Sequence, residues 1–413
     1  QLACFVNIYY NAKYFQREVH TCMGAKKYAY VNYKMLVWAR SETPFGTTSD
    51  VANHISGFRS EVIDKWERGE ELPSITEAKK LANLYKVPFA TFYLSNPPEK
   101  KIKAYTDRRT YNDTVYRETS YELWSEIGRI TGNRQIIVNL SDDTEYRSLP
   151  SVGPKLSEKQ IADVIRMYFE LDLPFKNKSA YRNNGFNYYR ALLEHYGIMV
   201  AQITGVSLSE MRGISMYYDI FPIIAINNKD FERAKVFSLF HEVAHLVRRS
   251  SSLCLIDFDE RNDEEEKICD RIAAEVLMPE ESFRYVSSNA LNLYGEWSDL
   301  CLISIADKYA VSTFSVVRRL RELDIINRSD YYSIYKRISD SFKEEQDSII
   351  QNKKDREFKV KYYITYLSKE GYLFPKKVLS AYSRGDISYG EMCSTLSIKG
   401  KHISNIERAV MFI

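Results

Sequence analysis

The sequence predicts an α+β protein that is mainly helical, with an all-α amino-terminal part, a central part with a small three-stranded sheet, and a helical carboxyl-terminal region. Helical periodicity and capping signals run through most of its 413 residues. Three short apolar runs predict the strands, at Ile198–Ile203, Gly213–Tyr217 and Pro222–Ile226. A strongly apolar helical stretch at 236–247 follows, so we expect the sheet to pack beside a buried helix.

The composition limits the class of protein. The length suits two or three domains rather than one, and a hydrophobic share of 45% is enough to build their cores. No apolar run reaches the length that spans a bilayer, so no membrane partner is expected. The six cysteines are scattered without a C-x-x-C pair, which fits a reduced, cytoplasmic protein without a disulfide framework. The net charge of +3 argues neither for nor against nucleic acid.

The amino-terminal domain is expected to span residues 26–98. Residues 1–25 are expected to be an extension or tail, because Gln1–Cys22 lacks the apolar core of a signal peptide and Met23 is a more natural start. Gly69 fits a helix end and Ser74 a helix restart. The expected helices are Asn32–Ser41, Thr48–Ser56, Ser60–Arg68 and Ile75–Tyr85, with a last turn near Phe89–Leu94.

Three segments of this domain resemble the helix-turn-helix module of the phage-repressor (XRE) class, namely Asp50–Asn53, Trp66–Ser74 and Leu81–Pro88. The resemblance implies that the helix over 60–68 is the one that enters the major groove in DNA-binding members. The candidate DNA contacts would then be Arg59, Ser60, Lys65 and Arg68. Glu61, Asp64 and Glu67 bring the local charge near zero, so DNA binding and a role in protein recognition or dimerisation both stay open.

The stretch His241-Glu242-Val243-Ala244-His245 has the pattern H-E-x-x-H, which indicates a metal site. Positions i and i+4 of a helix share one face, so both imidazoles can bind one ion, and Glu242 can reach a metal-bound water as general base. The alternative is a solvated face on an ordinary amphipathic helix. The apolar residues around the motif argue against it, because buried histidines need partners and a metal supplies them.

A second helix, expected over 262–277 and ended by Pro279, offers the third ligand that a catalytic zinc needs. Its apolar stripe continues to Glu266, whereas the two preceding glutamates simply favour the helix amino terminus. Glu266 has an inward Asp270 four residues later. That carboxylate can accept a hydrogen bond from the free ring nitrogen of a ligand histidine, which we expect to be His241.

Together these helices resemble the gluzincin metallopeptidases, in which H-E-x-x-H is followed by E-x-x-x-D on a second helix. The stretch Glu266–Pro279 is closer still to the ImmA/IrrE family of bacterial metallo-endopeptidases, with Cys269 in place of the usual Ala and Ile272 in place of the usual Phe. Upstream, Met211–Ser215 and Phe221–Asn228 also resemble that family.

The resemblance implies a gluzincin-like metallopeptidase domain over 119–290 and a Zn²⁺ cofactor. The zinc ligands would be His241, His245 and Glu266, with Glu242 as catalytic base. Positional candidates for stabilising the oxyanion are Tyr217, Tyr218 and Arg212. An edge strand would bind an extended peptide by strand addition. The expected substrate is a protein, in particular a helix-turn-helix transcriptional repressor whose cleavage derepresses mobile-element or stress-response genes.

The rest of the chain shows no chemistry of its own. Residues 99–118 are expected to form a basic, solvated linker, and His195 is expected to be a structural histidine. A second helix-turn-helix-like segment at 291–328 is expected, with Ser312 as a cap. The helical region at 329–413 leaves regulation, substrate docking and oligomerisation open. Further helices are expected around Glu118–Thr131, Ser157–Glu170, Asn187–Tyr196, Cys301–Tyr309 and Thr313–Leu323.

Two alternatives to an enzyme stay open. One is a DNA-binding transcriptional regulator whose peptidase fold acts as a sensor or partner platform, and the other is an antitoxin-like interaction protein. Metal content separates the peptidase from both. A salt-titrated DNA-binding assay separates DNA binding from protein docking by the amino-terminal domain.

Overall fold

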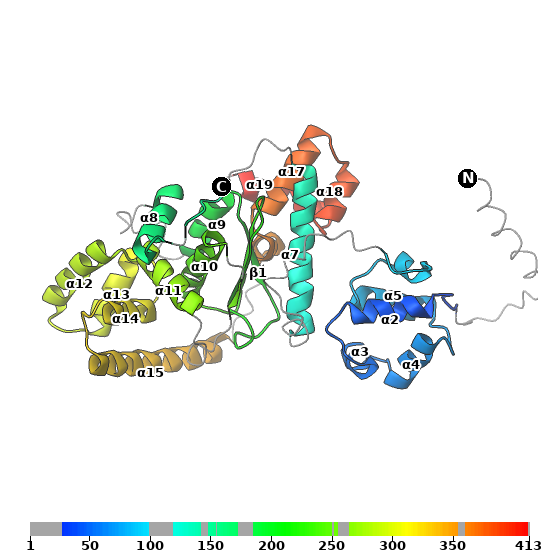
Figure 1. Ribbon diagram of the computed structural model, residues 1–413, viewed down its shortest axis with the longest axis horizontal. Helices are drawn as coiled ribbons and strands as arrows, with labels where there is room; N and C mark the ends of the chain where they lie inside the picture. Colours follow the sequence, from blue (N-terminus) through cyan, green and yellow to red (C-terminus); the bar gives the residue numbers. More distant parts are fainter. Residues whose placement is uncertain are drawn as a thin grey trace, which may run out of the picture. The chain divides into compact units, whose positions relative to one another are not determined.

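The computed structural model contains two compact units, Gln1–Thr106 and Asp107–Ile413, which are described separately (Figure 1). The described residues are 27–98, 119–141, 148–153, 155–171, 185–249, 252–254, 264–353 and 360–411. The expected extension at 1–25 and the expected linker at 99–118 lie outside these residues.

The first unit consists of short helices whose ends follow from capping residues. They are α2 (Tyr33–Ser41), α3 (Thr48–His54), α4 (Ser60–Arg68), α5 (Ile75–Leu84) and the 3₁₀ turn η1 (Phe89–Tyr93). Thr47 and Ser74 form capping boxes that start α3 and α5, and Gly69, with a φ of +73°, ends α4. The sequence predicts these bounds to within two residues. Assignment of the unit to the helix-turn-helix class stays a prediction.

A mixed four-stranded sheet lies at the centre of the second unit, in the order β1-β3-β2-β4. Its strands are β1 (Met199–Ile203), β2 (Gly213–Met216), β3 (Ile223–Asn227) and β4 (Ser252–Cys254). β1 and β3 are parallel, whereas β2 is antiparallel to both β3 and β4. The three predicted strands are therefore present. The expected count of three is too low, because β4 is a three-residue strand that forms only by pairing with the free edge of β2.

Helices make up most of the rest of the second unit. They are α7 (Tyr121–Leu140), α8 (Glu158–Tyr168), α9 (Gly185–His195), α10 (Glu232–Val247), α11 (Glu264–Leu277), α12 (Glu280–Tyr294), α13 (Asp299–Tyr309), α14 (Thr313–Glu322), α15 (Arg328–Lys353), α16 (Tyr362–Glu370), α17 (Leu373–Arg384), α18 (Tyr389–Thr395) and α19 (Ile403–Met411). α7 continues to Leu140 rather than ending at Thr131 as predicted, because Ile137 extends its buried face.

Alternate residues of the central strands face two different cores. On one face, Val200, Ile224 and Ile226 join a core built with α9, α10, α11, α13 and α14. On the other face, Met199, Ala201 and Ile223 join a core built with α7 and helices of the carboxyl-terminal region. Figure 1 shows the sheet between α10 on one side and α7 on the other. The two histidines of the motif are thus carried by a helix that the sheet covers.

The segments after α12 belong to these same two cores. α13 and α14 contribute Ile305 and Leu320 to the core that contains α10 and α11. Ser312 caps α14 by accepting a hydrogen bond from the backbone of Ser315, as the sequence predicts. The division of this unit at residues 290 and 328 stays a prediction. Within the described residues, no single helix has the length and apolar composition to cross a membrane; the bent pair α13–α14 meets those criteria only when joined.

Candidate metal centre

Helix α10 carries three of the predicted site residues on one buried stretch. His241, Glu242 and His245 are exposed by only 6%, 0% and 0%. The Nε2 atoms of the two histidines lie 3.1 Å apart, on the face that the four-residue spacing creates. Two imidazole nitrogens this close in a buried place need a shared proton or a shared cation between them.

Helix α11 brings Glu266 to the same point. Its Oε2 lies 3.2 Å from Nε2 of His241, and its Oε1 lies 3.5 Å from Nε2 of His245. Ligands that surround zinc tetrahedrally at about 2.0–2.1 Å are separated from one another by about 3.3–3.4 Å. The three observed separations bracket that value, so the donor atoms of these residues fit one tetrahedral zinc ion.

The other ring nitrogen of each histidine contacts α11. Nδ1 of His241 lies 2.9 Å from Oδ1 of Asp270, the contact that the sequence predicts. Nδ1 of His245 lies 3.5 Å from Sγ of Cys269, a contact that sequence reasoning missed because Cys269 counted only as a buried apolar residue. A histidine that binds metal through Nε2 carries its proton on Nδ1, so Asp270 and Cys269 would both accept hydrogen bonds.

Glu242 has no partner within the described part of the chain. Its side chain is fully buried, and neither carboxylate oxygen forms a hydrogen bond there. Leaving a carboxylate buried without hydrogen bonds is costly. A water molecule beside a metal ion would satisfy it, which is a second reason why the cluster fits a hydrolytic metal centre.

Gly213 of β2 makes room for this carboxylate. A methyl group at Gly213 would fall 2.5 Å from Oε1 of Glu242. Gly213 belongs to the stretch Met211–Ser215 on which the family resemblance rests in part, but nothing in the sequence assigned it a role. The structure identifies it as a site residue, because only glycine lets the strand approach the glutamate so closely.

The surroundings determine the charge of the cluster. Burial alone would raise the pKa of Glu266, but hydrogen bonds with the two histidines bring it well below its ordinary value. Burial would also raise the pKa of Asp270, which is lowered overall by the bond to its histidine and by the charge of Arg318. Burial raises the pKa of the Cys269 thiol. The cluster thus presents two anionic carboxylates and a neutral thiol.

A second group of ligand types, His245, Glu265 and Cys269, overlaps the first. Here both carboxylate oxygens of Glu265 are held by Arg248, at 2.7 Å each. The thiol of Cys269, whose pKa burial raises, would have to lose its proton before it could bind a metal. We therefore assign the metal to the group that contains Glu266.

The predicted oxyanion candidates lie near the carboxyl-terminal end and the start of β2. The hydroxyl of Tyr217 donates to Asp219 at 2.7 Å. The ring of Tyr218 stacks against Arg134, whose guanidinium carbon is 3.6 Å from the ring centre. Arg212 lies one residue before β2. None of these placements assigns an oxyanion partner.

The four predicted DNA contacts lie on or beside α4 in the first unit. Arg59 is exposed and directly precedes the helix, whereas Ser60 is half-buried. Lys65 and Arg68 are paired with acidic side chains that follow α4, at 2.6 and 2.7 Å. Two of the four predicted contacts are therefore already neutralised within their own unit.

Comparison with models of protein families gives a match within the second unit. A family model for the IrrE N-terminal-like domain, a peptidase family, matches residues 194–321. The matched stretch contains the sheet, α10 and α11, and it continues through α13 and α14. It supports a peptidase of the ImmA/IrrE kind. No curated protein matches the chain.

Proposed function

We propose that this protein is a zinc-dependent endopeptidase. The observation that carries the proposal is the convergence of His241, His245 and Glu266 beside the buried, unpartnered carboxylate of Glu242. Two imidazoles and a carboxylate are the ligand set of zinc hydrolases that keep a fourth position for water. The similarity of residues 194–321 to a peptidase family supports the same conclusion.

A zinc ion bound there would polarise the scissile carbonyl and lower the pKa of a water molecule. Glu242 would take up the proton of that water on its carboxylate and return it to the leaving amine. Both of its oxygens are available for this, because neither is engaged by another described group. Asp270 holds Nδ1 of His241 and thereby directs Nε2 towards the metal.

The strand edge beside the site is partly covered. β2 is the strand that touches Glu242, and its outer edge pairs with β4 over Gly213–Ser215. Strand addition of a substrate peptide to β2 therefore requires displacement of β4 or use of the backbone beyond Ser215. Strand addition can instead use β4, which is the outermost strand on this side of the described sheet.

We further propose that the substrate is a regulatory protein, namely a helix-turn-helix transcriptional repressor, and that its cleavage derepresses mobile-element or stress-response genes. The resemblance to the ImmA/IrrE family supports this substrate class, and a repressor substrate implies action in the cytoplasm.

Co-expression with the repressor encoded beside this gene tests the proposal. The wild type should generate a cleavage product, whereas Glu242→Gln should generate none and still bind zinc with wild-type stoichiometry. Glu281→Gln is the matched control, because that side chain is 91% exposed and should leave cleavage unchanged. Equal cleavage by Glu242→Gln, or wild-type protein that binds no zinc, would contradict the proposal.

A further inference from the structure

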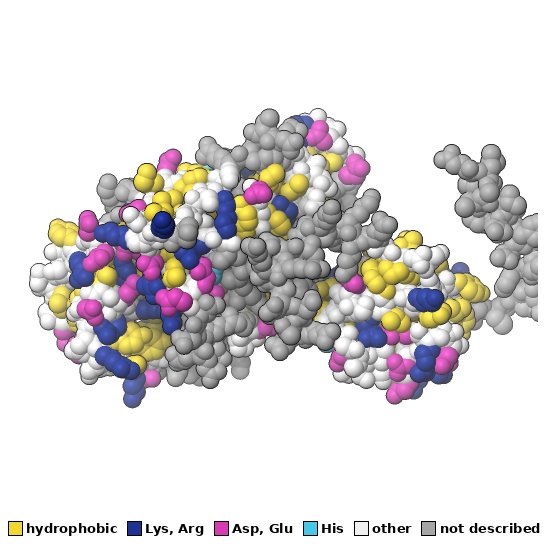
Figure 2. Space-filling view, viewed as in Figure 1, with side chains coloured by type: hydrophobic (Ala, Val, Ile, Leu, Met, Phe, Trp, Pro, Cys, Tyr) yellow, Lys and Arg dark blue, Asp and Glu magenta, His cyan; other side chains and the backbone are white. Residues whose placement is uncertain are grey.

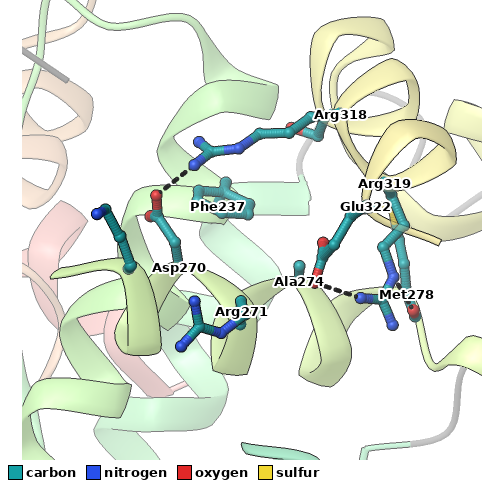
Figure 3. A pocket seen from close by; sticks show the side chains of 10 residues that line it. Phe237, Asp270, Arg271, Ala274, Met278, Arg318, Arg319 and Glu322 are labelled. Atoms are coloured by element: carbon teal, nitrogen blue, oxygen red, sulfur yellow. Dashed lines mark hydrogen bonds and ion pairs between the residues drawn. The ribbon is translucent and has the colours of Figure 1, made fainter. Parts of the chain in front are cut away.

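The carboxylate of Asp270 is shared between two residues. Its Oδ1 lies 2.9 Å from Nδ1 of His241, and its Oδ2 accepts a hydrogen bond of 2.6 Å from Nη2 of Arg318 (Figure 3). Arg318 belongs to α14, in the segment that the sequence assigns to a separate helix-turn-helix-like pair. A carboxylate that is bound at both oxygens has its orientation fixed.

Helix α14 is held firmly on α11, so the position of Arg318 is defined. The next residue, Arg319, is only 3% exposed. It donates to the backbone carbonyl of Met278 at 3.1 Å and pairs with Glu275 of α11 and with Glu322. Val316 and Leu320 on the same helix are fully buried in the core that contains α10.

The side chain of Arg318 is half-exposed and is held by a charge-assisted hydrogen bond to Asp270. It is 51% exposed, whereas the side chain of Asp270 is 11% exposed. It lines a cavity of about 240 Å³ between α11 and α14, together with Phe237, Ala274 and Met278 (Figure 3). An arginine beside open space keeps one position only through its hydrogen bonds, and a charge-assisted bond of this length is a strong one.

We propose that Arg318 is a positioning residue of the metal centre. It fixes Asp270 in the orientation that accepts the Nδ1 proton of His241, and so keeps Nε2 of His241 directed at the metal. The proposal rests on the proposed function, because it requires His241 to be a ligand. It also makes α14 part of the metal centre.

The paired charges on the surface around α14 fit a role within the protein better than a role in nucleic-acid binding. In Figure 2, Lys and Arg side chains are interspersed with Asp and Glu over the face of the second unit that carries α11, α12 and α14. A surface that binds nucleic acid would need Lys and Arg side chains that are not paired with acidic side chains. On α14, Arg319 is paired with two glutamates, Arg321 with Asp324, and Arg318 with Asp270.

Zinc affinity of the full-length protein tests the proposal, measured by competition with a chromophoric chelator. Arg318→Gln should weaken zinc binding by about tenfold, the lower end of what outer hydrogen-bond partners of a ligand contribute. It should also alter the visible absorption of the Co²⁺-substituted protein. Arg318→Lys, which keeps the charge, should restore most of the affinity.

Arg321→Gln is the matched control on the same helix. It should bind zinc like the wild type, because Asp324, the partner of Arg321, is far less buried than Asp270.

The Asp270→Asn background distinguishes positioning from general stability. If Arg318 acts through Asp270, Arg318→Gln should cause no further loss of zinc affinity in that background. An equal loss in both backgrounds, or an unchanged affinity of Arg318→Gln in wild-type protein that binds zinc, would overturn this inference alone. Wild-type protein that binds no zinc would overturn the proposed function with it.

Discussion

The carboxylate of Glu242 lies so close to Gly213 that a methyl group on that glycine would fall 2.5 Å from Oε1. Real side chains do not approach so closely. The backbone of β2 therefore forms one wall around the proposed base, with no side chain between them. This contact links the strand expected to guide the substrate with the group expected to move the proton.

Gly213→Ala should displace Glu242 and lower the cleavage rate by about a hundredfold or more, within the range that a general base contributes. Zinc affinity should change by less than about threefold, because the substitution leaves Asp270 and Cys269, the partners of the two ligand histidines, in place. Losing such a partner is what weakens zinc binding by about tenfold or more. Cleavage kinetics and chelator competition measure the two effects. A variant with normal cleavage would show that Glu242 adapts and that Gly213 is not required.

Gly128→Ala and Gly132→Ala are the matched controls for this experiment. Both positions lie within helix α7, and a methyl group at either would meet nothing within 4 Å. Alanine should be neutral or stabilise the protein by up to about 1 kcal/mol there, because glycine is a poor helix residue. Thermal unfolding of all three variants separates a local effect at Glu242 from a general loss of fold.

Cys269→Ala should weaken zinc binding only modestly, by less than about tenfold, whereas Asp270→Asn should weaken it by about 10- to 100-fold. The two side chains differ in how strongly they accept a hydrogen bond from a ligand histidine. Sγ of Cys269 lies 3.5 Å from Nδ1 of His245 and is a weak acceptor, whereas the carboxylate of Asp270 is an anion 2.9 Å from Nδ1 of His241. Chelator competition measures both. Cys301→Ala is the control, because it removes a fully buried thiol from α13 in the same core. A larger loss for Cys269→Ala than for Asp270→Asn would reverse this ranking.

The parts of the fold that the sequence predicts are those determined by residues close together in the chain. Ser74 and Ser312 each cap a helix through their own side chain, so these starts depend only on neighbouring residues. The length of α7 and the existence of β4 depend on distant partners instead. Ile137 continues α7 because helices near the carboxyl terminus cover it, and β4 forms because β2 offers a free edge. Such elements leave no local pattern.

The same distinction applies to the candidate site. His241 and His245 share a face because of helical spacing, and Glu266 and Asp270 follow the same rule on the next helix. The residues that sequence reasoning missed come close only in three dimensions. Gly213 reaches Glu242 through the sheet, and Arg318 reaches Asp270 from another helix. A glycine or an arginine in isolation does not indicate a contact of this kind.

Double substitution of Glu70 and Glu71 by Gln should strengthen DNA binding if α4 faces DNA. These residues hold Arg68 and Lys65 at 2.7 and 2.6 Å, so removing their charge frees two cations. Two additional phosphate contacts would steepen the dependence of log K on log salt by up to about 2 units. Fluorescence anisotropy across a salt series measures this slope.

The control for that experiment keeps the change in net charge but moves it away from α4. Glu281→Gln combined with Glu296→Gln alters the second unit by the same amount and should leave the slope at its wild-type value. Identical slopes for the double variant on α4, the control and the wild type would show that Lys65 and Arg68 make no phosphate contacts, which would contradict the assignment of α4 as the DNA-reading helix.

The stability of the second unit should fall as pH rises between about 4.5 and 7, because of Glu194. Burial raises the pKa of this carboxyl to about 7, even though the backbone of Tyr372 donates to both of its oxygens, at 3.1 and 3.0 Å. The charge of Arg190 lowers this pKa more than the backbone hydrogen bonds do, but it does not cancel the effect of burial. Its guanidinium donates to the carbonyls of Val200 and Ser368 and stays 4.0 Å from the carboxylate.

A folded-state pKa above the unfolded one means that the folded protein keeps a proton which the unfolded chain releases. The stabilisation is complete below about pH 4.5 and is lost as pH rises to 7, at about 1.4 kcal/mol per pH unit. Urea unfolding at constant ionic strength should show this decline for the wild type and for the exposed control Glu296→Gln. In Glu194→Gln the decline should be much smaller, and what remains should come from carboxyls such as Glu322 and Glu370, whose pKa values burial also raises. Parallel pH profiles for wild type and Glu194→Gln would show that Glu194 is ionised in the folded protein and that Arg190 does compensate its charge.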